Sequence, residues 1–201
     1  MGILEDWGIS LEELGQILSA RPSVRGILIG FLAEYKLTPI FQDARIHAFK
    51  RFDDHDRNRP ADFGFTYGGY PFSIEVKSLQ TSSVRKTDDG YKGAAQCDAS
   101  DKRPVKLPNG ETVSTTCLVA GEFDILAVNI FEFGHTWRFA YIRNSDLPHS
   151  KSPKYTPEQQ SHLLATTVQV KWPLQKPFYA DPFVLLAEMA EEKRIAARPR
   201  R

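Results

Sequence analysis

The charged side chains of residues 62–77, DFGFTYGGYPFSIEVK, have a spacing that could support chemistry. The glycine pair at 68–69 predicts a two-residue hairpin turn, and this turn fixes which residues of the two strands face each other. The resulting register places Asp62 opposite Glu75, at a position where two Cα atoms lie about 4.5 Å apart in an ideal ladder. Because side chains alternate along a strand, Asp62, Glu75 and Lys77 emerge on one face and the apolar side chains on the other.

Two facing carboxylates repel each other, and a divalent cation between them would remove this repulsion. Mg²⁺ prefers carboxylate and water oxygens and binds few protein carboxylates together with substrate phosphate. Lys77 lies one side-chain repeat beyond Glu75, where it could orient a water or stabilise negative charge on a phosphate. Together these groups predict metal-assisted phosphodiester hydrolysis. The alternative is a surface hairpin whose acids face solvent, with Lys77 as their screen.

Two helices are predicted before this hairpin. Ser10 and Glu13 form a capping box that begins a short helix, which ends near Arg21-Pro22. The next helix carries one apolar stripe, which we expect to pack flat against a sheet. The stripe consists of Val24, Ile27, Leu28, Phe31, Leu32 and Tyr35.

Strands and further helices are predicted after the hairpin. The apolar run FDILAVNIF at 123–131 is typical of a central strand covered on both faces. Asn109-Gly110 predicts another hairpin, with a type I′ turn. Later strands are WRFAYI and TVQVKW, and later helices begin at Thr156-Pro157 and Asp181-Pro182. This order predicts an α/β domain with a mixed sheet and helices packed on it.

Length and composition indicate one globular domain spanning residues 1–201. Its net charge of +1 does not indicate a nucleic-acid binder, so any such surface must be local. We expect a cytoplasmic protein without membrane association, because no apolar run approaches the roughly 20 residues of a membrane span and no signal peptide is recognisable. Cys97 and Cys117 lack zinc-type spacing and are expected to be reduced and structural.

The succession of a helix, an Asp on one strand, Glu-x-Lys on the next, an apolar strand and a helix resembles the PD-(D/E)XK nuclease superfamily, which includes many restriction endonucleases. The resemblance covers residues about 20–145, although its exact signature is only three residues. It implies a restriction-endonuclease-like mixed central β-sheet flanked by α-helices. One departure is the order Pro60-Ala61-Asp62, since the family places Pro directly before Asp.

Residue roles follow from this resemblance. It implies that Asp62, Glu75 and the main-chain carbonyl of Val76 bind the metal, and that Lys77 positions the attacking water. Many family members add a Glu from the preceding helix, for which Glu34 is the candidate; it could equally meet solvent. The implied cofactor is Mg²⁺, with Mn²⁺ as a substitute.

The segment after the hairpin mixes cations with Gln and turn residues, and could contact DNA. Cations would bind phosphates, whereas Arg and Gln could read base edges. A solvated loop balanced by its own aspartates is the alternative. The basic C-terminal tail, residues about 193–201, could add phosphate contacts, and the DDHD cluster at 53–56 is interpreted as a solvated loop. The candidate DNA-binding residues are Arg85, Lys86, Lys92, Gln96, Lys102 and Arg103.

These inferences predict a Mg²⁺-dependent endonuclease of double-stranded DNA, similar to type II restriction enzymes that act on foreign DNA in antiviral defence. The resemblance implies a homodimer, because two-fold symmetry suits the cutting of both strands. A cognate methyltransferase encoded nearby would favour restriction. The alternatives are a structure-specific or RNA-directed nuclease of the same superfamily, and a weakly catalytic DNA-binding subunit of a defence or repair complex.

Overall fold

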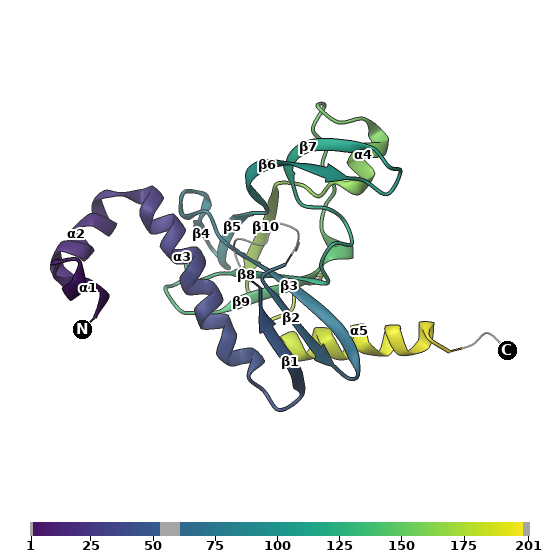
Figure 1. The fold of residues 1–201 in the computed structure, drawn as a ribbon, viewed down its shortest axis with the longest axis horizontal. Coiled ribbons are helices and arrows are strands. Elements are labelled where there is room, and N and C mark those ends of the chain that lie inside the picture. Colours follow the sequence, from purple (N-terminus) through teal and green to yellow (C-terminus); the bar gives the residue numbers. More distant parts are fainter. Residues whose placement is uncertain (1, 53–60, 199–201) are drawn as a thin grey trace.

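The computed structural model describes residues 2–52 and 61–198, and its centre is a five-stranded mixed sheet in the order β1-β2-β3-β8-β9 (Figure 1). β3 and β8 run parallel, whereas the other neighbours are antiparallel. Helices flank this sheet, so the predicted α/β class with a mixed central sheet is confirmed. The strands are β1 (Ile46–Arg51), β2 (Phe63–Tyr67), β3 (Tyr70–Ser78), β8 (Ile125–Asn129) and β9 (Phe139–Arg143).

The β2–β3 hairpin has the predicted register. Phe63 pairs with Ile74 and Tyr67 with Tyr70, on either side of the turn at 68–69. Gly68 and Gly69 have φ angles of 57° and 83°, the left-handed conformation that a type I′ turn needs and that glycine adopts without a steric penalty.

β8 is buried along its whole length, as the apolar run predicted. Ile125 and Ala127 face a core layer that includes residues of α3 (Pro22–Leu37) and α5 (Pro182–Ala196). Leu126 and Val128 face a second layer, to which β5 (Gly90–Gln96) and β10 (Thr167–Trp172) contribute. A strand covered on both faces has no polar side, which explains its continuous hydrophobicity.

A second sheet, in the order β10-β5-β4, and a two-stranded ribbon of β6 and β7 complete the β structure. Much of the segment for which a solvated loop was considered is therefore strand. The predicted hairpin at Asn109-Gly110 is confirmed, but its predicted type I′ turn is wrong. Only Gly110 of the pair has a positive φ, and its N–H donates to the Leu107 carbonyl; Pro108, with φ fixed near −65°, suits the first central position of a type I turn instead. The remaining strands are β4 (Arg85–Thr87), β6 (Asp98–Lys106) and β7 (Thr112–Cys117).

Within the described residues, three α-helices and one 3₁₀ turn precede β1. The Ser10 side chain accepts a hydrogen bond from the Glu13 N–H at 3.1 Å and Glu13 caps Ser10 in return, which confirms the predicted capping box. The other helices are α1 (Ile3–Asp6), α2 (Leu11–Ala20), α4 (Pro157–His162) and the 3₁₀ turns η1 (Thr38–Phe41), η2 (Thr81–Ser83) and η3 (Asn144–Asp146).

The predicted apolar stripe of α3 does not face the sheet, so that prediction is wrong. Ile27 and Tyr35 of the stripe are 64% and 70% exposed, whereas Ala33 and Leu37, on the opposite side of the helix, are buried in the core. Apolar periodicity marks a face that avoids water, but it does not specify the partner. The stripe is thus left on the outer surface of the molecule.

The predicted C-terminal tail begins inside α5. Lys193 of this helix donates to the Pro71 carbonyl at 2.8 Å and pairs with Asp124 at 3.1 Å, which ties the helix to the hairpin. Residues 199–201 and the DDHD cluster at 53–56 lie outside the described residues. None of the helices in the described part of the chain combines the length and apolar character of a membrane span.

Candidate active site

Asp62 lies immediately before the first residue of β2, where the neighbouring β3 continues beyond the hairpin pairing. Its N–H donates to the Ile74 carbonyl at 2.9 Å, and its side-chain Oδ2 accepts from the Val76 N–H at 2.6 Å. The carboxylate therefore pairs a main-chain donor of β3 that a longer β2 would otherwise have paired. Because the N–H and C=O of one strand residue point to the same side, the Val76 carbonyl is also directed toward Asp62.

Glu75 and Lys77 form a close ion pair on the face of β3 opposite to Ile74 and Val76. Lys77 Nζ lies 2.5 Å from Glu75 Oε1, and the two side chains are only 23% and 9% exposed. Burial by itself lowers the pKa of Lys77, but the charge and hydrogen bond of Glu75, with a smaller contribution from Asp62, raise this pKa above its ordinary value. Lys77 is therefore a stable cation beside both carboxylates.

Both cysteines are buried free thiols, as predicted. Burial is the main reason that the pKa of Cys97 is raised to about 12, although the nearby Lys77 opposes this increase. A thiol with such a pKa stays protonated at neutral pH, so Cys97 is not a nucleophile.

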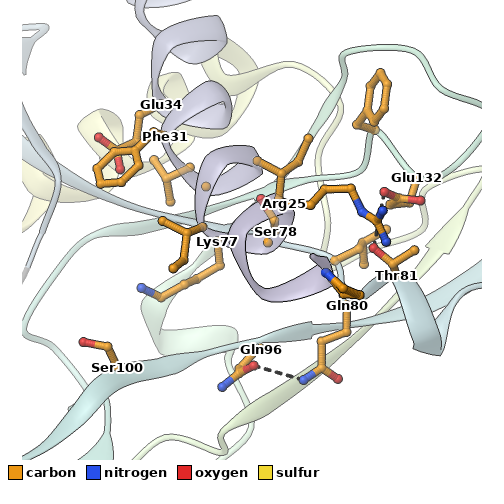
Figure 2. Close-up of a pocket in the computed structure, with 18 of the residues that line it drawn as sticks. Arg25, Phe31, Glu34, Lys77, Ser78, Gln80, Thr81, Gln96, Ser100 and Glu132 are labelled. Carbon is orange, nitrogen blue, oxygen red and sulfur yellow. Dashed lines mark hydrogen bonds between the residues drawn. The ribbon is translucent and has the colours of Figure 1, made fainter. Parts of the chain in front are cut away.

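An open groove of about 1200 Å³ runs over this site, between α3 and the segments that follow β3 and β5. Asp62, Val76 and Lys77 line one part of it. Figure 2 shows the Lys77 ammonium directed into the groove and Glu34 on the helix side. The groove extends from these residues to a polar region that includes Gln80 and Gln96.

Glu34 lines the same groove but is engaged elsewhere. Its side chain is 15% exposed, and its Oε2 lies 2.9 Å from a guanidinium nitrogen of Arg51 in β1. The geometry thus brings Glu34 to the site region and gives it a structural ion pair. Its role as a metal ligand stays a prediction.

The donor set fits the implied metal. Within the described residues, no three or more His, Cys, Asp or Glu side chains are clustered for metal binding. Mg²⁺ does not need such a cluster, since it binds through one or two carboxylates and keeps several waters. Asp62, Glu75 and the Val76 carbonyl are oxygen donors of the required kind.

The structure aligns two of the candidate DNA-binding residues and adds a third. Arg85 of β4 lies directly opposite Lys92 of β5, and Lys92 lies opposite Lys171 of β10. All three side chains are exposed and form a row of cations across three strands, which we call the cationic row. Like charges directly opposite each other are unfavourable, so this arrangement favours an anionic ligand. Lys171 was not among the predicted DNA-binding residues, although alternation in TVQVKW places it on the outer face.

Gln96 lies on the same face of β5 as Lys92, four positions along the strand, and reaches the groove. Its Oε1 accepts a hydrogen bond from Gln80 Nε2 at 3.1 Å, as Figure 2 shows. Gln80 carried no recognisable signal in the sequence, because its pairing depends on a contact between distant segments. The amide pair lines the groove together with Lys77, and Lys92 of the cationic row lies four residues from Gln96 on β5.

The other three candidates lie apart from this arrangement. Lys86 is opposite Tyr91, the residue next to Lys92, and Lys102 is exposed on β6. Arg103 is half-buried, donates to the Cys117 carbonyl at 3.4 Å and lies 3.9 Å from a Glu122 carboxylate oxygen. Their roles in DNA binding stay predictions.

Comparisons with known proteins give little further information. No protein-family model and no curated protein matches the sequence. A solved structure of a bacterial homing endonuclease, I-Ssp6803I, is similar over 68% of this chain and 86% of its own chain, with 12% sequence identity. The TM-score of 0.34 is too low for this similarity to bear on function.

Proposed function

We propose that the protein is a Mg²⁺-dependent endonuclease that hydrolyses phosphodiester bonds in double-stranded DNA. The observation that carries this proposal is the Asp62 carboxylate at the open end of the hairpin, beside the Glu75–Lys77 pair and on a groove. Carboxylates that could hold a metal, a cation and room for an extended substrate are combined there.

Asp62, Glu75 and the Val76 carbonyl are the groups that would hold the metal, with Glu34 as a further candidate. Bound Mg²⁺ would supply Lewis-acid chemistry at the scissile phosphate. Lys77 stays protonated at neutral pH because its pKa is raised, so it donates hydrogen bonds and does not accept a proton. It would therefore orient the attacking water or stabilise negative charge on the phosphate.

Duplex DNA would cross the groove and reach the cationic row. Arg85, Lys92 and Lys171 would bind phosphates, whereas the amides of Gln80 and Gln96 could contact base edges. The biological role that we propose is restriction-like cleavage of foreign DNA in antiviral defence, with a cognate methyltransferase encoded nearby.

The experiment is incubation of plasmid and phage DNA with the protein in Mg²⁺ or in EDTA. Glu75→Ala and Lys77→Ala are compared with wild type and with Lys151→Ala, which removes an exposed lysine outside the groove. We expect discrete fragments from wild type and Lys151→Ala, and none from the site variants or in EDTA. Equal cutting by all four proteins would contradict the proposal.

The same assay, repeated with branched DNA and with RNA and accompanied by a duplex-binding measurement, distinguishes the alternatives. Metal-dependent cutting of branched DNA or RNA, with intact duplex, would indicate a structure-specific or RNA-directed nuclease. Tight duplex binding without cleavage in Mg²⁺ would indicate a DNA-binding subunit.

A further inference from the structure

The N-terminal helices expose an unusual amount of apolar surface. Eleven large hydrophobic side chains are exposed in the described part of the chain, and nine of them lie between residues 3 and 35. We call this surface the helical arm; its exposed residues are Ile3, Trp7, Leu11, Ile17, Val24, Ile27, Leu28, Phe31 and Tyr35. Such a concentration on one segment marks an interaction surface and is not ordinary surface scatter.

The helical arm has little core of its own. Neither α1 nor α2 has a buried residue, and α3 buries only Ala33 and Leu37, near its C-terminal end. In Figure 1, α1 and α2 lie at the end of α3 that is distant from the central sheet. Short isolated helices are marginal in water, so α1 and α2 need a packing partner.

We propose that this partner is a second copy of the chain, and that the helical arms of two copies pack on each other around a two-fold axis. Charge supports this choice. Residues 2–20 contain four acidic side chains and no Lys or Arg, whereas residues 21–37 contain three basic side chains and one acidic side chain, Glu34, which pairs with Arg51. When the two arms run antiparallel across the two-fold axis, the acidic segment of each copy lies on the basic segment of the other, so each charge complementarity is made twice.

The same charges disfavour the other occupants. DNA phosphates and anionic lipid surfaces would be repelled by the acidic segment of residues 2–20. The area also suits a dimer: the nine side chains together expose on the order of 1000 Å², and a stable interface buries about 800 Å² per partner.

The inferred dimer does not rest on the proposed nuclease activity, but it would serve that activity. Ile27 and Phe31 belong to the arm and also line the groove. The interface would therefore border both grooves and bring the two candidate sites close to the same axis.

Sedimentation velocity of the full chain tests the proposal. We expect a species of twice the 22.8 kDa chain mass, weakened by high salt. Tyr35→Glu and Trp7→Glu should reduce it to monomer. Matched controls are Val184→Glu and Ile195→Glu, which place the same charge at exposed apolar positions of α5 outside the arm, and these should stay dimeric. Far-UV circular dichroism checks that all variants are folded.

A charge exchange tests the arrangement itself. One variant carries Asp6→Lys and Glu12→Lys, and the other carries Arg21→Glu and Lys36→Glu. Each alone should be monomeric, because the first variant cancels the net charge of residues 2–20 and the second makes both segments acidic. An equimolar mixture should form a heterodimer, because the unchanged acidic segment of one variant can pack on the unchanged basic segment of the other. Monomeric wild type, dimers that survive in the arm variants, or a mixture that stays monomeric would overturn the proposal. None of these results depends on DNA cleavage.

Discussion

The Asp62 carboxylate accepts a hydrogen bond from the Val76 main-chain N–H at 2.6 Å, just before β2 begins beside a longer β3. A side chain proposed to bind metal thus also completes the backbone hydrogen bonding of the hairpin. These two roles can be separated by substitution.

Asp62→Asn should keep the fold and lose the activity. The amide oxygen can still accept from Val76, but it carries no charge for the metal, so we expect a rate about 10²–10³-fold lower, the loss typical of removing one electrostatic catalytic group. Asp62→Ala should also lower the free energy of unfolding by about 1–3 kcal/mol, because it leaves the Val76 N–H without its acceptor. Nicking assays and urea unfolding measure the two effects. Full cleavage by Asp62→Asn would contradict the metal role.

Lys77→Met should destabilise the protein by about 3 kcal/mol, because it leaves the nearly buried Glu75 carboxylate without its counter-ion. The double variant Glu75→Gln/Lys77→Met should recover part of this loss. If Lys77→Met alone were as stable as wild type, the ion pair would make no contribution to the free energy of unfolding.

The same pair predicts a pH dependence. The pKa of Lys77 is raised in the folded protein above its ordinary value of 10.5, so its contribution to stability is fully present below pH 10.5 and is lost as the pH rises through the folded value. The difference in unfolding free energy between wild type and Lys77→Met should therefore shrink in alkaline buffers above pH 10.5. A difference that is constant up to pH 12 would contradict this linkage.

Lys171→Ala and Lys92→Ala should weaken DNA binding and reduce the salt slope of log K by about 1 each, as expected for the loss of one phosphate contact. Removing one of several like charges should leave stability unchanged or slightly higher. Fluorescence anisotropy at several salt concentrations, with Lys151→Ala as control, measures the first effect. Identical salt slopes in all proteins would indicate that the cationic row does not contact DNA phosphates.

Gln96→Ala should change sequence preference more than rate at the preferred site, because it removes an amide that could read a base edge and does not touch the carboxylates. Sequencing of the cleavage ends from a random-sequence library measures this preference. An unchanged preference combined with a lower rate would assign Gln96 to catalysis or structure instead.

The hairpin and β8 could be predicted from the sequence because their determinants are local. The glycine pair fixes the turn, alternation fixes the faces, and the continuous apolar run of residues 125–129 identifies a buried strand. The same count predicted Asp62 opposite Glu75, whereas Asp62 precedes β2, donates its N–H to the Ile74 carbonyl and accepts from the Val76 N–H through its side chain.

Other parts depend on contacts between distant segments. β5 includes the buried run Gly93, Ala94 and Ala95, small residues with weak strand preference, and becomes a strand because β4 and β10 pair with it. The outward direction of the α3 stripe likewise could not be inferred, since helical periodicity does not say which partner an apolar face will meet. Lys92 and Lys171 lie opposite each other although they are 79 residues apart in the sequence (171 − 92), so no local pattern could predict their alignment.

The double role of Asp62 bears on how the activity could be lost in evolution. A descendant freed from selection for cleavage would still need an acceptor for the Val76 N–H, and Asn would satisfy that need where Ala would not. A polar residue at position 62 in an inactive relative would then record the folding requirement, and only the acid itself, together with Glu75 and Lys77, would indicate a working enzyme.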